Sequence, residues 1–284
     1  MGVLSALLSA TLLFQGEAGC AAPSGSQGLL DDAADRILVI GELHGTEQAP
    51  EFLDALTCLS LERGETVAVG VEIPADDQDA IDAYLESSGD GEARAALLSS
   101  PFWASDDGRS SAAQLELLDA LRLRRQDGQP VSVKALDFGS GDVDLLEDYD
   151  QASARDRAMA RHAREAAETA DRVLVLVGNI HARRTRLEGD DFVAESIGSV
   201  TEGDDFFFVR TTYGPGEAWN CIMVDEELSC GVHPRPGRSR TDAPRVLERD
   251  AADESPQRTY DAYVYLGETT ASRPARRVYG IEPE

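Results

Sequence analysis

The sequence has few basic residues, and this shortage excludes several kinds of partner. Its 284 residues include 53 Asp and Glu but only 26 Lys and Arg, a formal net charge of −27 at pH 7. Lys134 is the only lysine. A surface of this sign repels the phosphates of nucleic acids and anionic lipid head groups. We therefore expect neither nucleic acid nor an anionic membrane surface among its partners.

Two motifs for covalent chemistry are also missing. No serine follows a strand in the G-x-S-x-G spacing of a nucleophile elbow, and Gly139-Ser140-Gly141 lacks that spacing. No C-x-x-C-H motif is present, so any haem would be bound without a covalent link. These absences argue against a serine nucleophile of that type and against covalently attached haem.

The apolar segment at the N-terminus, MGVLSALLSATLLF, is too short to span a bilayer and is typical of a signal sequence. We predict a signal or lipoprotein signal over residues 1–22, a linker over 23–34 and one domain over 35–284. Ala18-Gly19-Cys20 resembles the end of a lipoprotein box, whose cysteine is lipidated, although Glu17 replaces the usual aliphatic residue. The alternative is an export signal cut near Ala22. Either reading predicts an exported protein of the cell envelope, anchored in the membrane if Cys20 carries lipid.

The remaining cysteines fit an exported protein. Cys221 and Cys230 flank IMVDEELS, a strand–turn–strand pattern that can bring them within bridging distance. A disulfide there needs an oxidising compartment. Cys58 lies in an apolar helical stretch and is expected to be a buried thiol.

Four short apolar runs rich in β-branched residues predict strands buried on both faces, as in a parallel sheet. They are RILVIG (36–41), TVAVGVEI (66–73), VSVKALDF (131–138) and RVLVLVG (172–178). Helical patterns lie between them, at 49–64, 76–89, 110–128 and 151–170. This alternation predicts an α/β fold with a central, mostly parallel sheet flanked by helices.

The later part of the chain predicts added antiparallel strands. DFFFVRTTYG and AWNCIMVDEELSCGV have this pattern, and TYDAYVYLGETT predicts a further strand. Between them, residues 234–259 are rich in Pro, Arg, Asp and Ser without apolar periodicity, and predict a loop.

Each of the four predicted strands ends in an ionisable side chain. The first ends in Gly41-Glu42-Leu43-His44 and the fourth in Gly178-Asn179-Ile180-His181, while Glu72 and Asp137 end the second and third. Ligands of open α/β sheets bind beyond the carboxyl ends of the strands. Two histidines that converge there with carboxylates can bind a metal or haem, or act as general bases.

The two motifs GELH and GNIH, with Glu72 between them, resemble a superfamily that joins ChaN-like haem-uptake proteins, Tiki proteases, TraB-type proteins and erythromycin esterases. Further stretches resemble its ChaN-like branch: SPFWASDDGRSSAAQLELLDALR, SARDRAMARHAREA and YDAYVYLGETTASRPA. The resemblance covers about residues 35–230 and the strand near 260–271. It implies site roles for Glu42, His44, Glu72, Arg155 and His181, with Arg109 as a weaker candidate.

Arg155 also shares a helix face with Met159 and His162. Because this helix leads to the strand that ends at His181, we expect its start at the opposite edge of the sheet, unless the preceding loop folds over the site. His162 is expected on the helix surface, and His233 next to a loop.

Two functions remain open at this stage, beside a third reading in which the protein is an envelope scaffold with a degenerate site. In the first, the protein binds a small-molecule ligand in the envelope: His44 and His181 hold haem, or with Glu72 hold a divalent metal such as Mn, Co or Zn. Phe102 and Trp103 are either an apolar surface for haem or part of the core. In the second, the protein is a hydrolase for esters or peptides: His44, polarised by Glu42 or Glu72, activates water and Arg155 stabilises the oxyanion.

Overall fold

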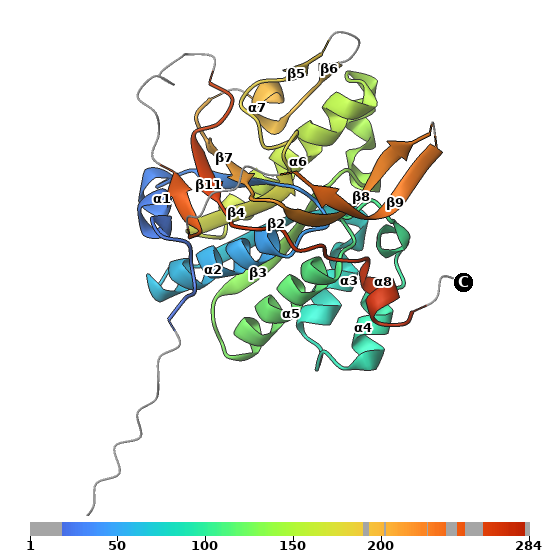
Figure 1. Ribbon diagram of the computed structural model, residues 1–284. Coiled ribbons are helices and arrows are strands. Elements are labelled where there is room, and N and C mark those ends of the chain that lie inside the picture. Colours follow the sequence, from blue (N-terminus) through green and yellow to red (C-terminus); the bar gives the residue numbers. More distant parts are fainter. Residues whose placement is uncertain are drawn as a thin grey trace, which may run out of the picture.

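The computed structural model describes residues 19–189, 193–201, 203–225, 227–236, 243–247 and 258–281. Its centre is a seven-stranded sheet with the order β10-β11-β7-β1-β4-β2-β3 (Figure 1). The strands are β1 (Ile37–Glu42), β2 (Val67–Pro74), β3 (Val131–Asp137), β4 (Arg172–Gly178), β7 (Phe206–Thr212), β10 (Arg245–Leu247) and β11 (Ala262–Tyr265). All neighbours are parallel except β10 and β11. The predicted α/β class with a mostly parallel sheet is confirmed.

The expected antiparallel strands are found only in part. Strands β8 (Gly216–Val224) and β9 (Glu227–Arg235) form an antiparallel hairpin outside the main sheet. The strand over 206–212, however, was expected to be antiparallel, and it pairs parallel to β1. Its three consecutive phenylalanines are all buried, which is the pattern of a strand covered on both faces.

Helices cover both faces of the sheet (Figure 1). One face carries α2 (Gln48–Glu62), α3 (Gln78–Leu85) and α5 (Ala112–Gln126), and the other carries α6 (Gln151–Ala167). Leu38 and Ile40 of β1 belong to the first core, whereas Ile37 and Val39 belong to the second. This alternation follows from the two-residue period of a strand, and it explains why the strands are apolar throughout.

Shorter elements complete the fold. The helices are α1 (Ser26–Asp32), α4 (Gly91–Leu97), α7 (Ile197–Val200) and α8 (Ala275–Val278), and the 3₁₀ turns are η1 (Ala75–Asp77), η2 (Pro101–Ala104) and η3 (Ser140–Glu147). Strands β5 (Leu187–Glu188) and β6 (Val193–Ala194) pair outside the main sheet.

The position expected for the start of α6 was wrong. This helix returns the chain from β3 to the parallel strand β4, so it runs against the direction of the strands. Its first turn, which contains Arg155, therefore lies at the carboxyl edge of the sheet, beside the strand ends.

The N-terminal region departs from the sequence-based expectation. Residues 1–18 of the predicted signal lie outside the described part of the chain. The expected linker contains α1, and Leu29 and Leu30 of this helix are buried in the core. No helix among the described residues is long and apolar enough to cross a membrane.

Both pairs of cysteines form disulfides. The predicted bridge between Cys221 and Cys230 joins β8 to β9. Cys58 is not a free thiol, because it is bonded to Cys20. The sequence argument did not predict this pair, because the two cysteines are far apart in the chain and meet only when the N-terminal segment packs on α2. Since lipidation would use the same sulfur of Cys20, the lipid and this disulfide exclude each other.

The predicted loop over 234–259 is only partly described. Residues 227–235 belong to β9, and residues 245–247 form β10, which pairs antiparallel with β11. The expectation of an unstructured loop was therefore wrong for these residues. Residues 237–242 and 248–257 of the expected loop lie outside the described part.

Candidate active site

The five residues singled out at the strand ends lie together at one edge of the sheet. β1, β4, β2 and β3 are adjacent in that order and all parallel, so their carboxyl ends meet there. The first turn of α6 adds Arg155. An unbroken series of hydrogen bonds and ion pairs joins the six residues Glu42, His44, Glu72, Asp137, Arg155 and His181.

His44 lies between two carboxylates. Its Nδ1 is 2.9 Å from Glu42 Oε1, and its Nε2 is 3.4 Å from Glu72 Oε2. Burial by itself lowers the pKa of His44, but the charges of Glu72 and Glu42 outweigh it and raise the pKa to about 10. The ring is therefore an imidazolium at neutral pH, with both nitrogens as donors.

Glu72 is the central anion of the site. One of its oxygens accepts a hydrogen bond from the backbone N–H of Gly178 at 2.6 Å, and the other accepts from Arg155 Nη2 at 2.6 Å. Burial alone raises the pKa of Glu72, but the neighbouring cations, His44 first among them, hold it well below its usual value. Glu72 is thus a fixed carboxylate that keeps His44 protonated.

Arg155 connects three strand ends. Its Nε and Nη2 donate to the two oxygens of Asp137 at 2.6 and 2.7 Å, a bidentate pair. Its Nη1 lies 2.8 Å from His181 Nε2. Because a guanidinium can only donate, His181 Nε2 must carry a lone pair.

The second nitrogen of His181 has its own carboxylate. His181 Nδ1 lies 2.8 Å from Oδ1 of Asp156, which follows Arg155 on α6 and is 2% exposed. With Nε2 as acceptor, Nδ1 must carry the proton and donate it to Asp156. Burial raises the pKa of Asp156, against the opposing effect of His181. His181 is therefore neutral, in a tautomer fixed from both sides.

The sequence argument missed Asp156, although a signal was present. Asp156, Ala160 and Ala163 recur at helical spacing, and the two alanines belong to the core cluster between α6 and the sheet. A carboxylate on such an apolar face needs a buried partner.

The motif glycines let the two histidine turns approach each other. A Cβ on Gly178 would lie 2.7 Å from His44 Nε2, and one on Gly41 would lie 2.8 Å from both Asn179 Oδ1 and the Ala182 Cβ. Neither glycine has a positive φ. Their role is therefore close packing of one motif against the other.

Arg109, the weaker candidate, also reaches the site. Its Nη1 lies 3.3 Å from Asp137 Oδ2 and 3.8 Å from Glu72 Oε1. Its Nε and Nη2 pair with Asp107, which belongs to the same loop before α5. The site thus has a second guanidinium, supplied by a loop.

The other two histidines lie apart from this cluster. His162 was expected at the surface of α6 but is buried, because its Nδ1 donates to the carbonyl of Leu136 on the adjacent strand. His233 lies in β9, where its Nε2 is 3.1 Å from the carbonyl of Ser229.

The side chains at this edge do not fit haem or a divalent metal. Either group needs histidine lone pairs, but His44 is protonated between carboxylates and the lone pair of His181 faces Arg155. Phe102 and Trp103 are 7% and 1% exposed and belong to the core. Among the described residues, the one group of three ligand atoms close enough for a metal contains Cys20 and Cys58, which are bonded to each other.

Comparison with known proteins identifies the fold. No family model matches the sequence, and no curated protein matches it. Among solved structures, the chain is similar to a histidine-to-asparagine mutant of the erythromycin esterase EreC in its open conformation, with 12% identity and a TM-score of 0.61 over 86% of this chain and 94% of that one.

Two further solved structures match over a similar share of this chain. A succinoglycan biosynthesis protein has 10% identity and a TM-score of 0.64 over 87% of this chain and 91% of the other. A protein from Bacillus cereus has 11% identity and a TM-score of 0.60 over 87% and 92%. The chain therefore has the fold of an erythromycin esterase over most of its length.

Proposed function

We propose that the protein is a hydrolase that activates water for attack on an ester. One observation carries the proposal: the two histidines of the site are held in opposite protonation states. His44 is an imidazolium between two carboxylates, whereas His181 is neutral with its lone pair toward the site. Where the surroundings hold one titratable group protonated and its neighbour deprotonated, the first can act as the general acid and the second as the general base.

His181 is the general base. Asp156 holds the proton on Nδ1 and orients the ring, which leaves Nε2 to accept a proton from water. The raised proton affinity of Asp156 strengthens this hydrogen bond when His181 becomes positively charged. In this structure Nε2 accepts a hydrogen bond from Arg155. The substrate must therefore take over this N–H of Arg155 before Nε2 can accept a proton from water.

Arg155 and His44 are the two cations that act on negative charge in the proposed reaction. A carbonyl oxygen that takes the Nη1 hydrogen bond of Arg155 frees His181 and places its developing negative charge on the guanidinium. His44, 24% exposed at its side chain, is the proton donor to the departing alkoxide, which takes the Nε2–H that now lies 3.4 Å from Glu72 Oε2. His181 then releases to solvent the proton that it took from water, and His44 regains one from solvent. The negative charges of Glu42 and Glu72 keep His44 protonated until the leaving group departs.

The fold supports esters as the first substrates to test. It is shared with an erythromycin esterase over most of both chains, although 12% identity establishes the fold alone. Haem or metal binding was the other function that the sequence left open. The occupied histidine nitrogens favour acid–base chemistry by the protein's own side chains.

The test is hydrolysis of a panel of p-nitrophenyl and aliphatic esters by the purified protein after treatment with EDTA. We expect turnover that falls by about 10²- to 10⁴-fold in His181→Asn and in His44→Asn. His233→Asn is the matched control and should keep full activity, because His233 lies in the hairpin. Equal activity in all three variants, or no turnover of any ester, would overturn the proposal.

A further inference from the structure

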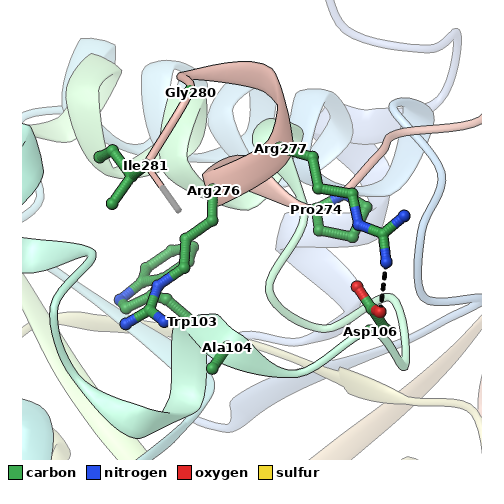
Figure 2. A pocket seen from close by; sticks show the side chains of 8 residues that line it. All are labelled: Trp103, Ala104, Asp106, Pro274, Arg276, Arg277, Gly280 and Ile281. Atoms are coloured by element: carbon green, nitrogen blue, oxygen red, sulfur yellow. Dashed lines mark hydrogen bonds and ion pairs between the residues drawn. The ribbon is translucent and has the colours of Figure 1, made fainter. Parts of the chain in front are cut away.

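A pocket lies between η2 and α8. It has a volume of about 340 Å³ and is lined by Trp103, Ala104, Asp106, Pro274, Arg276, Arg277, Gly280 and Ile281. Figure 2 shows Trp103 and Arg276 on one side and Asp106 and Arg277 on the other. The volume is within the range of small-molecule sites.

The two arginines of this pocket differ in their partners. Arg277 is paired with Asp106 and lies over the ring of Trp219, 5.0 Å from its centroid. Arg276 donates only to backbone carbonyls among the described residues: its Nε to Leu98 and its Nη2 to Ser100. Its charge therefore has no carboxylate partner in the described part of the chain.

An arginine without a carboxylate is notable in a chain with twice as many acidic as basic residues. The carbonyl of Leu98 follows the last turn of α4, so Arg276 is held in place by the fold. A guanidinium has five N–H donors, and these two bonds leave its Nη1 free to donate. A guanidinium that is held in place above a cavity, with no carboxylate partner among the described residues, is suited to a carboxylate or phosphate.

The walls of the pocket add an apolar requirement. Ile281 presents partly exposed carbon surface, and Trp103 and Pro274, which also line the pocket, are themselves largely buried. We propose that this pocket binds a small organic anion, with its carboxylate or phosphate on Arg276 and its apolar body against these three residues. The proposal does not depend on the hydrolase function.

The tryptophans provide a direct measurement. The chain has two, Trp103 in the pocket wall and Trp219 beneath Arg277, so intrinsic fluorescence is sensitive to a ligand in this pocket. Because Trp219 also contacts Gly45 beside His44, the variants below decide which site is occupied. We would titrate the protein with benzoate and phenyl phosphate, and with benzyl alcohol and inorganic phosphate as the apolar and the anionic part alone. A saturable fluorescence change is expected for benzoate and phenyl phosphate. Their dissociation constants should be at least tenfold lower than those of benzyl alcohol and inorganic phosphate.

Two variants locate the site. Arg276→Met removes the charge, and Ala104→Phe fills the pocket while Arg276 remains; each should abolish the saturable change. Arg186→Met is the matched control, since Arg186 is 56% exposed and pairs with Glu188 elsewhere. If Arg276→Met fails to fold, Ala104→Phe decides the question. Absence of saturation in the wild-type protein, or unchanged binding in Ala104→Phe, would overturn the proposal.

Discussion

Replacement of Glu72 by glutamine should lower the pKa of His44. Glu72 is the nearest anion to His44 Nε2, at 3.4 Å, and the first of the charges that raise the pKa of His44. Glutamine keeps the shape and an oxygen acceptor for the backbone N–H of Gly178. The change therefore removes the charge while leaving the packing nearly intact.

The expected size of the effect follows from the distance. Two unit charges 3.4 Å apart attract by about 5 kcal/mol at an effective dielectric constant of about 20, and by about 1 kcal/mol in bulk water. With about 1.4 kcal/mol per pKa unit, Glu72→Gln should lower the pKa of His44 by roughly one to four units. We expect a value in the lower half of this range, since the ring is 24% exposed.

The assay is a pH titration of the histidine side chains by NMR, followed through the imidazole nitrogens of the four histidines. Glu42→Gln should also lower the pKa of His44, and Glu188→Gln, at an exposed position, should leave it unchanged. A pKa of His44 near 6.5 in the wild-type protein, or one that Glu72→Gln does not alter, would refute the assignment of His44 as a buried cation.

Other predictions concern stability and shape. Because the pKa of His44 is raised on folding, its contribution to the free energy of unfolding should be complete below pH 6.5 and disappear as pH rises to about 10, as denaturant titrations at several pH values would show. Arg155→Met should lower that free energy by about 3 kcal/mol, since it removes the closest cation of the buried carboxylates Asp137 and Glu72 and leaves them only the longer contacts to Arg109 and His44; a loss below about 1 kcal/mol would contradict this. Gly178→Ala should displace His44 and abolish ester hydrolysis while the circular dichroism spectrum stays unchanged; full activity would contradict the packing argument. Cys20→Ser should lower the free energy of unfolding by about 4 kcal/mol, from the separation of 38 residues to Cys58. The intact mass of the purified wild-type protein should show a disulfide; a diacylglyceryl adduct on Cys20 would contradict it.

The strand ends could be located from the sequence because their signals are local. Runs of β-branched residues mark buried strands, and parallel strands bring their carboxyl ends together. Glu42, Glu72, Asp137 and His181 therefore lie where the pattern placed them, and the class of fold follows from the same alternation.

The remaining features depend on contacts between distant segments. The direction of α6, which brings Arg155 to the site, follows from chain geometry that the sequence argument applied wrongly. The pair of Cys20 with Cys58 and the parallel pairing of β7 with β1 arise from tertiary packing, which no local period encodes. The protonation states of the two histidines could be assigned only from the interatomic distances in the structure.

The pH dependence of kcat/KM for ester hydrolysis tests the central claim most directly. Measured from about pH 5 to about pH 11, with folding checked at each point, activity should fall as His44 loses its proton near pH 10. In Glu72→Gln the same fall should begin at lower pH. Activity that instead rises through this range would show that His44 acts as the base, and would contradict the assignment of His181 to that role.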